Sequence, residues 1–381
     1  MSSPHPAPAR RNLLEAYFRL APLTVPVYAI LLASLVGSLF ILGAGGNPLV
    51  AYTALLEGAL GSPDRIAATV ARATPFMICA LAVALGFKAG LFNIGAEGQL
   101  LLGALTAAWV GTWSWLAATP ALVAAPLVLV SGVVGGLVWG GIAGVLKART
   151  GAHEVITTIM LNAIAAGLVS FLITSRDPAL LIDANASTPH TQKVADSVRL
   201  PILVGGSSLH LGIVLALTLC LAVWFVLQRT TPGFEIRTVG VNPNAARYAG
   251  MRVNRTIVLV MMASGALAGV AGAAEVIGGS SGYLTPGAFT NIGFDSIAIA
   301  LLARGNPLAV VPAALLWGAL LSGAPLMQVQ ADLSVNLVRI VQALIILFIA
   351  ADAIVRLLFR IRAPREAGID EPARFARGWG G

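Results

Sequence analysis

The chain has 381 residues, of which 57% are hydrophobic and only 10% are charged, whereas an ordinary soluble domain is about 25% charged. This composition excludes a water-soluble fold and indicates that most of the chain lies in a lipid bilayer. The net charge of +8 does not indicate nucleic-acid binding, because the positive residues are not gathered on one polar module.

Helices long enough to cross a bilayer need about 20 apolar residues, and windows of this kind recur along the chain. We predict about ten spans, at residues 25–43, 75–87, 93–115, 121–145, 155–174, 209–227, 256–277, 294–302, 308–326 and 336–359. The first run is too long for the core of a signal peptide, so we interpret it as a retained helix. The predicted fold class is therefore an all-α integral membrane protein.

The positive charges predict the orientation of these spans. With an even number of spans and a cytoplasmic N-terminus, most of the 24 Lys and Arg residues lie on the cytoplasmic side, as the positive-inside rule requires. The predicted organisation is a cytoplasmic segment 1–24, a transmembrane domain 25–360 and a cytoplasmic tail 361–381. Both termini are expected to be cytoplasmic.

Two polar segments interrupt the apolar pattern. The segment 175–207 is predicted to be an exposed outer loop that could contact an extracytoplasmic partner, and 229–255 an inner loop. Within the inner loop, Asn242 and Pro243 form a helix start signal and Gly250 a stop signal. A short helix on the cytoplasmic face is the expected result.

One short pattern, N-I-G-x-acid, occurs in both halves of the chain, from Asn93 to Glu97 and from Asn291 to Asp295. In the predicted topology the two copies enter the membrane from opposite sides, as inverted repeats do, and binding sites in such folds lie near the midplane. The second copy opens the short, Gly-bounded span 294–302, and irregular backbone at membrane depth lines a cavity or is buried in protein. The pattern predicts an inverted-repeat architecture with discontinuous helices.

Motifs for catalysis and metal binding are incomplete. A phosphate-binding Walker loop ends in G-K-S/T, and none of the three lysines, Lys88, Lys147 and Lys193, has that context. His153 and Glu154 begin like the zinc motif H-E-x-x-H, but Thr157 occupies the position of the second histidine. Cys79 and Cys220 lie in apolar runs. We therefore expect no catalytic residue and no metal site.

Several ionisable side chains nevertheless lie in or beside apolar runs: Glu97, Glu154, Glu275 and Asp295. Such groups are costly in a bilayer and are functional candidates. The alternative is structural, because a carboxylate is stable near the positive end of a helix. Asn162 likewise could be a solute ligand or a hydrogen-bonding contact between helices.

Four segments carry a resemblance to a known family. They are "GFKAGLFNIGAEGQLLLGA" from Gly86, "HEVITTIMLNAIA" from His153, "VGVNPNAARYAGM" from Val239 and "GFDSIAIALLARGNPLA" from Gly293. In this order they resemble the permease subunits of ATP-binding cassette (ABC) importers for nucleosides and, more distantly, for ribose-type sugars and branched-chain amino acids.

The resemblance implies a transport subunit without enzyme activity or a cofactor of its own, in the bacterial plasma (inner) membrane. The implied partners are a second permease subunit, cytoplasmic ATPases that bind ATP and Mg, an extracytoplasmic solute-binding protein or lipoprotein, and membrane lipids. Transport would proceed by alternating access, coupled to the ATPase through the inner loop. The implied coupling residues are Pro243, Asn244, Ala245, Ala246, Arg247 and Gly250.

A nucleoside offers a flat base and several hydroxyls, which suit aromatic and amide side chains. The expected pathway residues are Phe92, Asn93, Glu97, Asn162, Tyr283, Phe289, Asn291, Phe294 and Asp295. We expect free backbone amides in the two N-I-G-x-acid segments to donate to the solute, and Glu97 and Asp295 to orient this backbone. A sugar or branched-chain amino acid importer, and an ion-coupled transporter that uses Glu97, Asp295 or Glu275, stay open as alternatives.

Overall fold

A computed structural model of the chain describes residues 31–350. Within this range the regular secondary structure is helical, apart from three isolated β-bridges. Contacts divide the chain into two compact units. Among the described residues, one unit contains 31–45 and 335–350, and the other contains Gly46–Ser334.

The described part of the first unit contains the helix Leu31–Gly43 and α14 (Val335–Ala350). Leu31–Gly43 falls within the predicted span 25–43, and α14 begins one residue before the predicted span 336–359. The rest of both spans, like the predicted terminal segments 1–24 and 361–381, lies outside the described residues.

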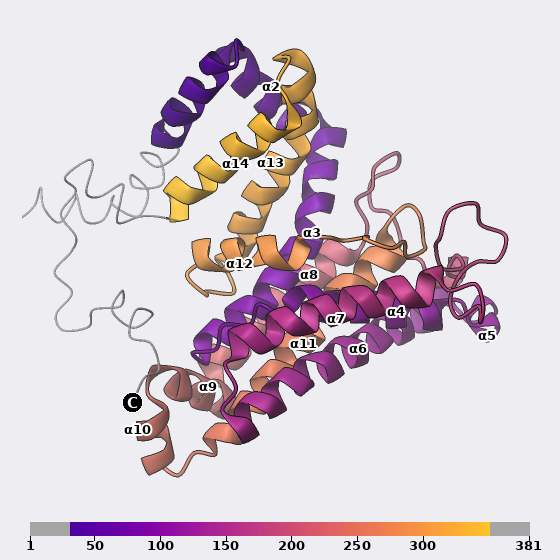
Figure 1. Ribbon diagram of the computed structural model, residues 1–381, viewed down its shortest axis with the longest axis vertical. Helices are drawn as coiled ribbons and strands as arrows, with labels where there is room; N and C mark the ends of the chain where they lie inside the picture. Colours follow the sequence, from indigo (N-terminus) through magenta and orange to yellow (C-terminus); the bar gives the residue numbers. More distant parts are fainter. Residues whose placement is uncertain (1–30, 351–381) are drawn as a thin grey trace, which may run out of the picture. The chain divides into compact units, whose positions relative to one another are not determined.

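The second unit contains the functional candidates (Figure 1). Its helices are α2 (Pro48–Leu60), α3 (Pro63–Lys88), α4 (Ala96–Gly111), α5 (Ser114–Ala117), α6 (Ala121–Thr150), α7 (Glu154–Thr174), the 3-10 turn η1 (Asp196–Val198), α8 (Gly212–Arg229), α9 (Thr231–Val241), α10 (Pro243–Tyr248), α11 (Val253–Gly278), α12 (Ile292–Leu302) and α13 (Val310–Gln330). In Figure 1, α10 and α5 lie at opposite ends of this unit.

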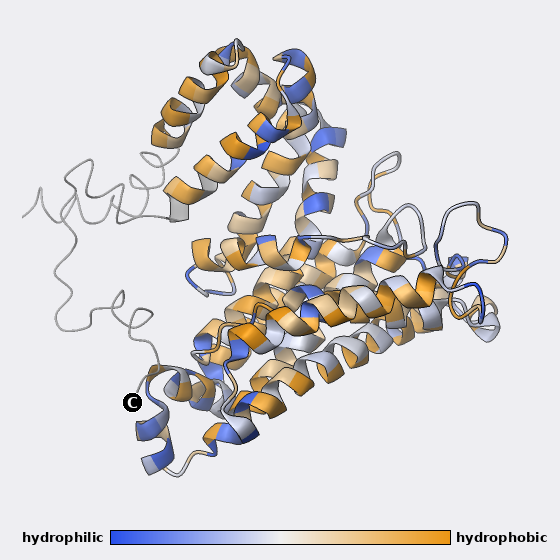
Figure 2. Cartoon of the chain, in the orientation of Figure 1, coloured by the Kyte–Doolittle hydropathy of each residue, from blue (hydrophilic) through white to orange (hydrophobic). Residues whose placement is uncertain are grey.

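Six of the described helices, α3, α6, α7, α8, α11 and α13, are long and apolar enough to cross a membrane. The count becomes seven if Leu31–Gly43 and α2 together form one span. Figure 2 shows hydrophobic residues along these helices and hydrophilic residues gathered around α9 and α10 and in the loops. The all-α membrane class is confirmed, while the count of ten spans stays a prediction.

The region before residue 75 differs from the sequence prediction. Helix α2 was not predicted, and α3 begins at Pro63, with its N-terminus capped by the Ser62 side chain, which accepts from the Arg65 amide. Pro75, interpreted as a span start, lies inside α3. The charged residues in the first turns of α3 lower its hydrophobicity, so the sequence pattern did not indicate a helix there. One of them, Arg72, donates to the Leu321 carbonyl of α13 at 3.2 Å.

Glycines bring α4, α6 and α11 into backbone contact. A side-chain carbon added to Gly136 of α6 would overlap the Gly265 carbonyl oxygen of α11, and the reverse also holds. Gly103 of α4 and Gly269 of α11 meet in the same way. Small residues permit this close approach between membrane helices, so these three helices form one tightly packed block.

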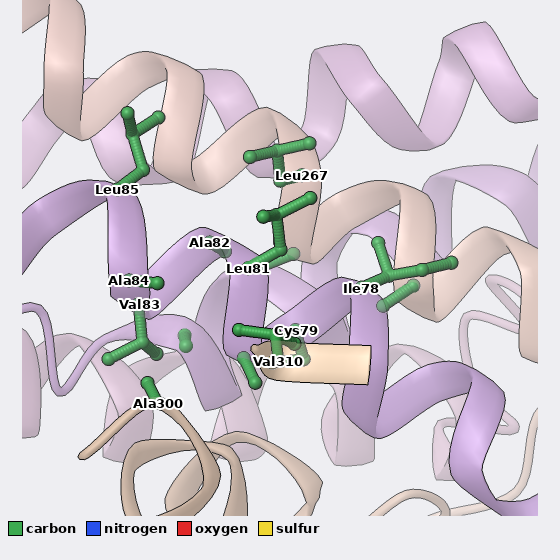
Figure 3. Close-up of a cluster of buried hydrophobic side chains, with 14 of the residues drawn as sticks. Ile78, Cys79, Leu81, Ala82, Val83, Ala84, Leu85, Leu267, Ala300 and Val310 are labelled. Atoms are coloured by element: carbon green, nitrogen blue, oxygen red, sulfur yellow. The ribbon is translucent and has the colours of Figure 1, made fainter. Parts of the chain in front are cut away.

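Helix α3 forms the core of the unit. Figure 3 shows Leu81 and Val83 of α3 next to Leu267 of α11 and Ala300 of α12, respectively, with Cys79 on the same buried helix. All three α3 side chains are fully buried. A helix that is apolar on all sides is stable where protein surrounds it, and its C-terminal end therefore has a fixed position beside the N-I-G-x-acid segments.

The loop between α7 and α8, residues 175–211, is hydrogen-bonded to the linker between α11 and α12, residues 279–290. The Thr191 amide donates to the Leu284 carbonyl, and the Leu284 amide donates to the Thr191 hydroxyl, each at 3.0 Å. The Arg199 guanidinium donates to the Gly279 and Ser280 carbonyls. Most residues of the loop are nevertheless exposed, and a few of its backbone groups pair with this distant segment; its predicted contact with an extracytoplasmic partner stays a prediction.

Candidate functional site: the two N-I-G-x-acid segments

The two N-I-G-x-acid segments are in direct contact. Glu97, in the first turn of α4, accepts from the Asn291 amide at 2.7 Å and from the Gly293 amide at 2.6 Å, one bond to each carboxylate oxygen. Its side chain is 6% exposed. A side-chain carbon added to Gly293 would overlap the Glu97 backbone, so glycine permits this approach.

The Glu97 carboxylate thus caps the N-terminus of α12, where unpaired amides and the helix dipole favour an acceptor with negative charge. This geometry agrees with the expectation that Glu97 orients the backbone. It also shows that the amides of Asn291 and Gly293 are occupied. In this conformation they cannot donate to a solute, contrary to the expectation of free amides.

Asn93, in the first segment, is 0% exposed. Its amide nitrogen donates to Gln99 at 2.9 Å and to the Ser264 hydroxyl of α11 at 2.7 Å, and its oxygen accepts from the Gly95 amide at 3.0 Å. Ser264 in turn donates to the Ala82 carbonyl of α3 at 2.7 Å. In this conformation Asn93 holds helices together and faces protein groups rather than a solute.

Asn162 of α7 has a similar arrangement, with 5% of its surface exposed. It donates to the Ile94 carbonyl and accepts from the Gly98 amide, both at 2.9 Å. Ile94 lies in the break between α3 and α4, residues 89–95, where Gly90 adopts a positive φ of 70°, and Gly98 lies in the first turn of α4. The side chain supplies bonds that the interrupted helix cannot supply itself.

The second segment is the more exposed of the two. Asn291 is exposed and has a φ of 70°, and Phe294 is 42% exposed. Asp295 is half-buried, while Ser296 and Ala300 of the same helix are fully buried. Residues three and four apart share one helix face, so Asn291, Phe294 and Asp295 form a polar and aromatic surface at the start of α12.

The aromatic side chains among the other predicted pathway residues contact further parts of the protein. Phe92 packs on Phe87, with ring centroids 5.1 Å apart. Tyr283 stacks on His190 of the 175–211 loop, with centroids 4.3 Å apart. Phe289, with a positive φ of 61°, packs against the buried apolar clusters.

Two cavities open elsewhere in the unit, with volumes of about 120 and 310 Å³. They share Trp109 of α4 and two leucines of the 175–211 loop, and neither is lined by a predicted pathway residue. Among residues 31–350, no group of three or more His, Cys, Asp or Glu side chains could hold a metal ion. Glu154, another ionisable candidate, pairs with Lys147 at 2.9 Å and so joins α7 to α6.

The predicted inner helix is present as α10, and the Asn242 side chain caps it by accepting from the amides of Asn244 and Ala245 at 3.0 Å. Ala246 is 0% exposed and packs against Val239 and Val253. The expectation that Ala246 meets a partner surface is therefore wrong for this conformation.

The exposed apolar side chain of α10 is Tyr248, at 94% exposure, which the sequence analysis did not single out. A helix of six residues is too short for its buried face to be read from hydrophobic periodicity. Tyr248 follows buried Ala246 by two positions, and this spacing places it on a different face of the helix.

Comparison with known families decides the class of protein. The family described as "Branched-chain amino acid transport system / permease component" matches residues 65–350. The chain belongs to this permease family. No solved structure matches the chain.

Three curated relatives of this permease match over most of their length. The chain is 42% identical to the guanosine ABC transporter permease protein NupP of Bacillus subtilis, over 89% of this chain and 96% of the relative. It is 37% identical to the nucleoside ABC transporter permease protein NupB of Lactococcus lactis, over 88% and 92%. A glucose ABC transporter permease protein of Haloferax volcanii is 36% identical, over 85% and 86%.

The resemblance seen in the sequence is thereby confirmed, and the chain is an ABC transporter permease, a transport component rather than an enzyme. This membership excludes an ion-coupled secondary transporter. A second permease protein of the Bacillus subtilis guanosine transporter, NupQ, matches at 25% identity over 66% of this chain. The Bacillus subtilis guanosine transporter thus has two permease proteins that are similar to this chain.

Proposed function

We propose that this permease belongs to an importer of nucleosides in the bacterial plasma membrane. The observation that carries the proposal is the similarity to guanosine and nucleoside permeases at 42% and 37% identity over most of both chains. A sugar importer is the second candidate, because the glucose permease relative is 36% identical. Both kinds of solute present several hydroxyl groups.

The surface at the start of α12 is our proposed contact with the solute. Asn291 both donates and accepts hydrogen bonds, which suits hydroxyls and heterocyclic bases, and Phe294 offers a ring for stacking on a base. Glu97 occupies the backbone amides there. The solute is therefore recognised through side chains, and Glu97, Asn93 and Asn162 position the segments that carry them.

The second proposed contact is between α10 and a cytoplasmic ATPase that binds ATP and Mg. Tyr248 and Arg247 are exposed on α10, and Ala246 anchors the helix from its buried side. We further propose that residues 229–255 and both termini lie in the cytoplasm, and that the 175–211 loop faces the solute-binding protein. A paralogous second permease completes the transporter, and lipids contact the exposed apolar faces.

Uptake by proteoliposomes that contain the whole transporter tests the substrate class. We expect ATP-dependent uptake of labelled guanosine that unlabelled nucleosides inhibit and that glucose and leucine do not. The permease without its ATPase serves as the control, and it should neither hydrolyse ATP nor accumulate solute. Uptake of glucose without uptake of any nucleoside would contradict the proposed substrate and favour the second candidate.

A further inference from the structure

We propose that Gly240 of α9 is a positioning residue for transport, because its backbone contact with the end of α3 transmits movement of α10 to α12. The inference rests on the proposed role of α10 as the ATPase contact. The proposed contacts connect a displacement of α10 to the solute-binding surface at the start of α12.

The first step of the route is a firm connection between α10 and α9. Ala246 is fully buried with Val239 and Val253. The Asn242 amide at the junction donates to the Thr238 carbonyl of α9, and the Asn242 side chain caps α10. These contacts leave little freedom between the two helices, so a displacement of α10 moves α9 with it.

The second step is the contact between α9 and the last turn of α3. A side-chain carbon added to Gly240 would overlap the Lys88 carbonyl oxygen and would lie 2.9 Å from both the Ala89 carbonyl carbon and the Gly90 amide nitrogen. The backbones of the two segments therefore touch without an intervening side chain. Close-packed backbones resist compression, so movement of α9 displaces the end of α3.

The third step leads from α3 to both ends of α12. The Lys88 ammonium donates to the Arg304 carbonyl, at 3.5 Å, in the turn that follows α12. A side-chain carbon on Gly305 in that turn would lie 3.6 Å from Cβ of Phe87. At the other end, the α3–α4 break continues into Glu97, which holds the N-terminus of α12.

Helix α10 is also connected directly to α11 by the chain, but movement through this connection would not displace α12 alone. Helix α11 is locked to α6 and α4 by backbone contacts at Gly265 and Gly269. A push along α11 would therefore move this whole block, including the Glu97 end of α4. The Gly240 contact acts instead on the C-terminal end of α3, beside the break where the chain is already interrupted.

The test uses the whole transporter in proteoliposomes, with Cys79→Ser and Cys220→Ser as the parent chain. The change Leu301→Cys places a thiol on the exposed face of α12, and its rate of maleimide labelling is measured without nucleotide and after trapping with ATP and vanadate. Gly240→Ala is the test variant. Gly167→Ala is the matched control, because a side-chain carbon there meets nothing within 4 Å.

We expect the parent and Gly167→Ala to show a nucleotide-dependent labelling rate that Gly240→Ala lacks. Uptake by Gly240→Ala should fall about tenfold, a usual size for lost coupling between sites, while the ATPase still copurifies. Lys88→Met, which keeps the apolar stem and removes the ammonium, should weaken the labelling response without preventing assembly, even if Gly240→Ala fails to assemble.

A labelling response and uptake that match the parent in both Gly240→Ala and Lys88→Met would overturn the proposed route. Failure of the proposed function has a different signature. In that case the parent itself would show no ATP-dependent uptake, and its labelling rate would not respond to nucleotide.

Discussion

Glu97 and Asn162 supply hydrogen bonds to backbone groups at interrupted helices. Glu97 accepts from two amides at the start of α12, and Asn162 pairs with one carbonyl and one amide beside the α3–α4 break. Buried backbone groups without a partner are costly. The polar side chains that the sequence marked as candidates therefore keep discontinuous helices stable inside the protein.

The first prediction concerns Glu97. Glu97→Ala leaves two amides at the start of α12 without an acceptor and should destabilise the complex by about 1–3 kcal/mol for each buried group. Glu97→Gln keeps one acceptor and should be milder in both thermal unfolding and uptake. Glu57→Gln is the control, because that carboxylate is exposed and pairs with Arg65. Equal behaviour of all three variants would contradict the capping role.

At the residue scale, the sequence predicted which polar positions matter but not what they contact. The recurrence of N-I-G-x-acid indicated that Glu97 orients backbone, and its hydrogen bonds agree. The burial of Asn93 depends on Ser264, which lies 171 positions away. Pairings across such separations follow from tertiary packing, and no local pattern contains them.

At the scale of elements, apolar length alone located most of the membrane helices. The predicted span 155–174 corresponds to α7 (Glu154–Thr174), and 256–277 corresponds to α11 (Val253–Gly278). The failures are α2 and the first half of α3. In the first half of α3, Arg65 and Arg72 donate hydrogen bonds to other protein groups. This half of the helix therefore contains charged residues that a lipid-facing helix would lack, and apolar length did not reveal it.

The second prediction concerns α10. Tyr248→Ala should leave α10 folded and reduce ATPase copurification and uptake, because it removes an exposed aromatic side chain of the kind that dominates protein contacts. Ala246→Trp should act differently. Its side chain has no room beside Val239 and Val253, and overpacking of this kind costs about 1–3 kcal/mol.

Limited proteolysis of residues 229–255 separates the two effects. We expect faster cleavage in Ala246→Trp and unchanged cleavage in Tyr248→Ala. Full uptake and normal copurification by Tyr248→Ala would show that the ATPase contact lies elsewhere.

At the scale of the whole molecule, the proposed transport role depends on the place where the two N-I-G-x-acid segments are in contact. The segments, 194 positions apart at Glu97 and Asn291, join α4 to the exposed start of α12. From this contact, the α3–α4 break connects to α3, which touches α9 and through it α10. The start of α12, on the other side of the contact, carries Asn291 and Phe294. The central claim is that this surface lines the solute pathway.

Thiol labelling at the start of α12 tests this claim most directly. Asn291→Cys and Phe294→Cys are introduced separately into the Cys79→Ser, Cys220→Ser chain. Thr150→Cys, an exposed position at the end of α6 and outside the proposed ATPase contact, is the control. Maleimide labelling is then measured in the whole transporter with and without guanosine-loaded binding protein and ATP. We expect solute and nucleotide to change labelling at 291 and 294 and not at 150. Labelling at 291 and 294 that neither solute nor ATP alters would contradict the account.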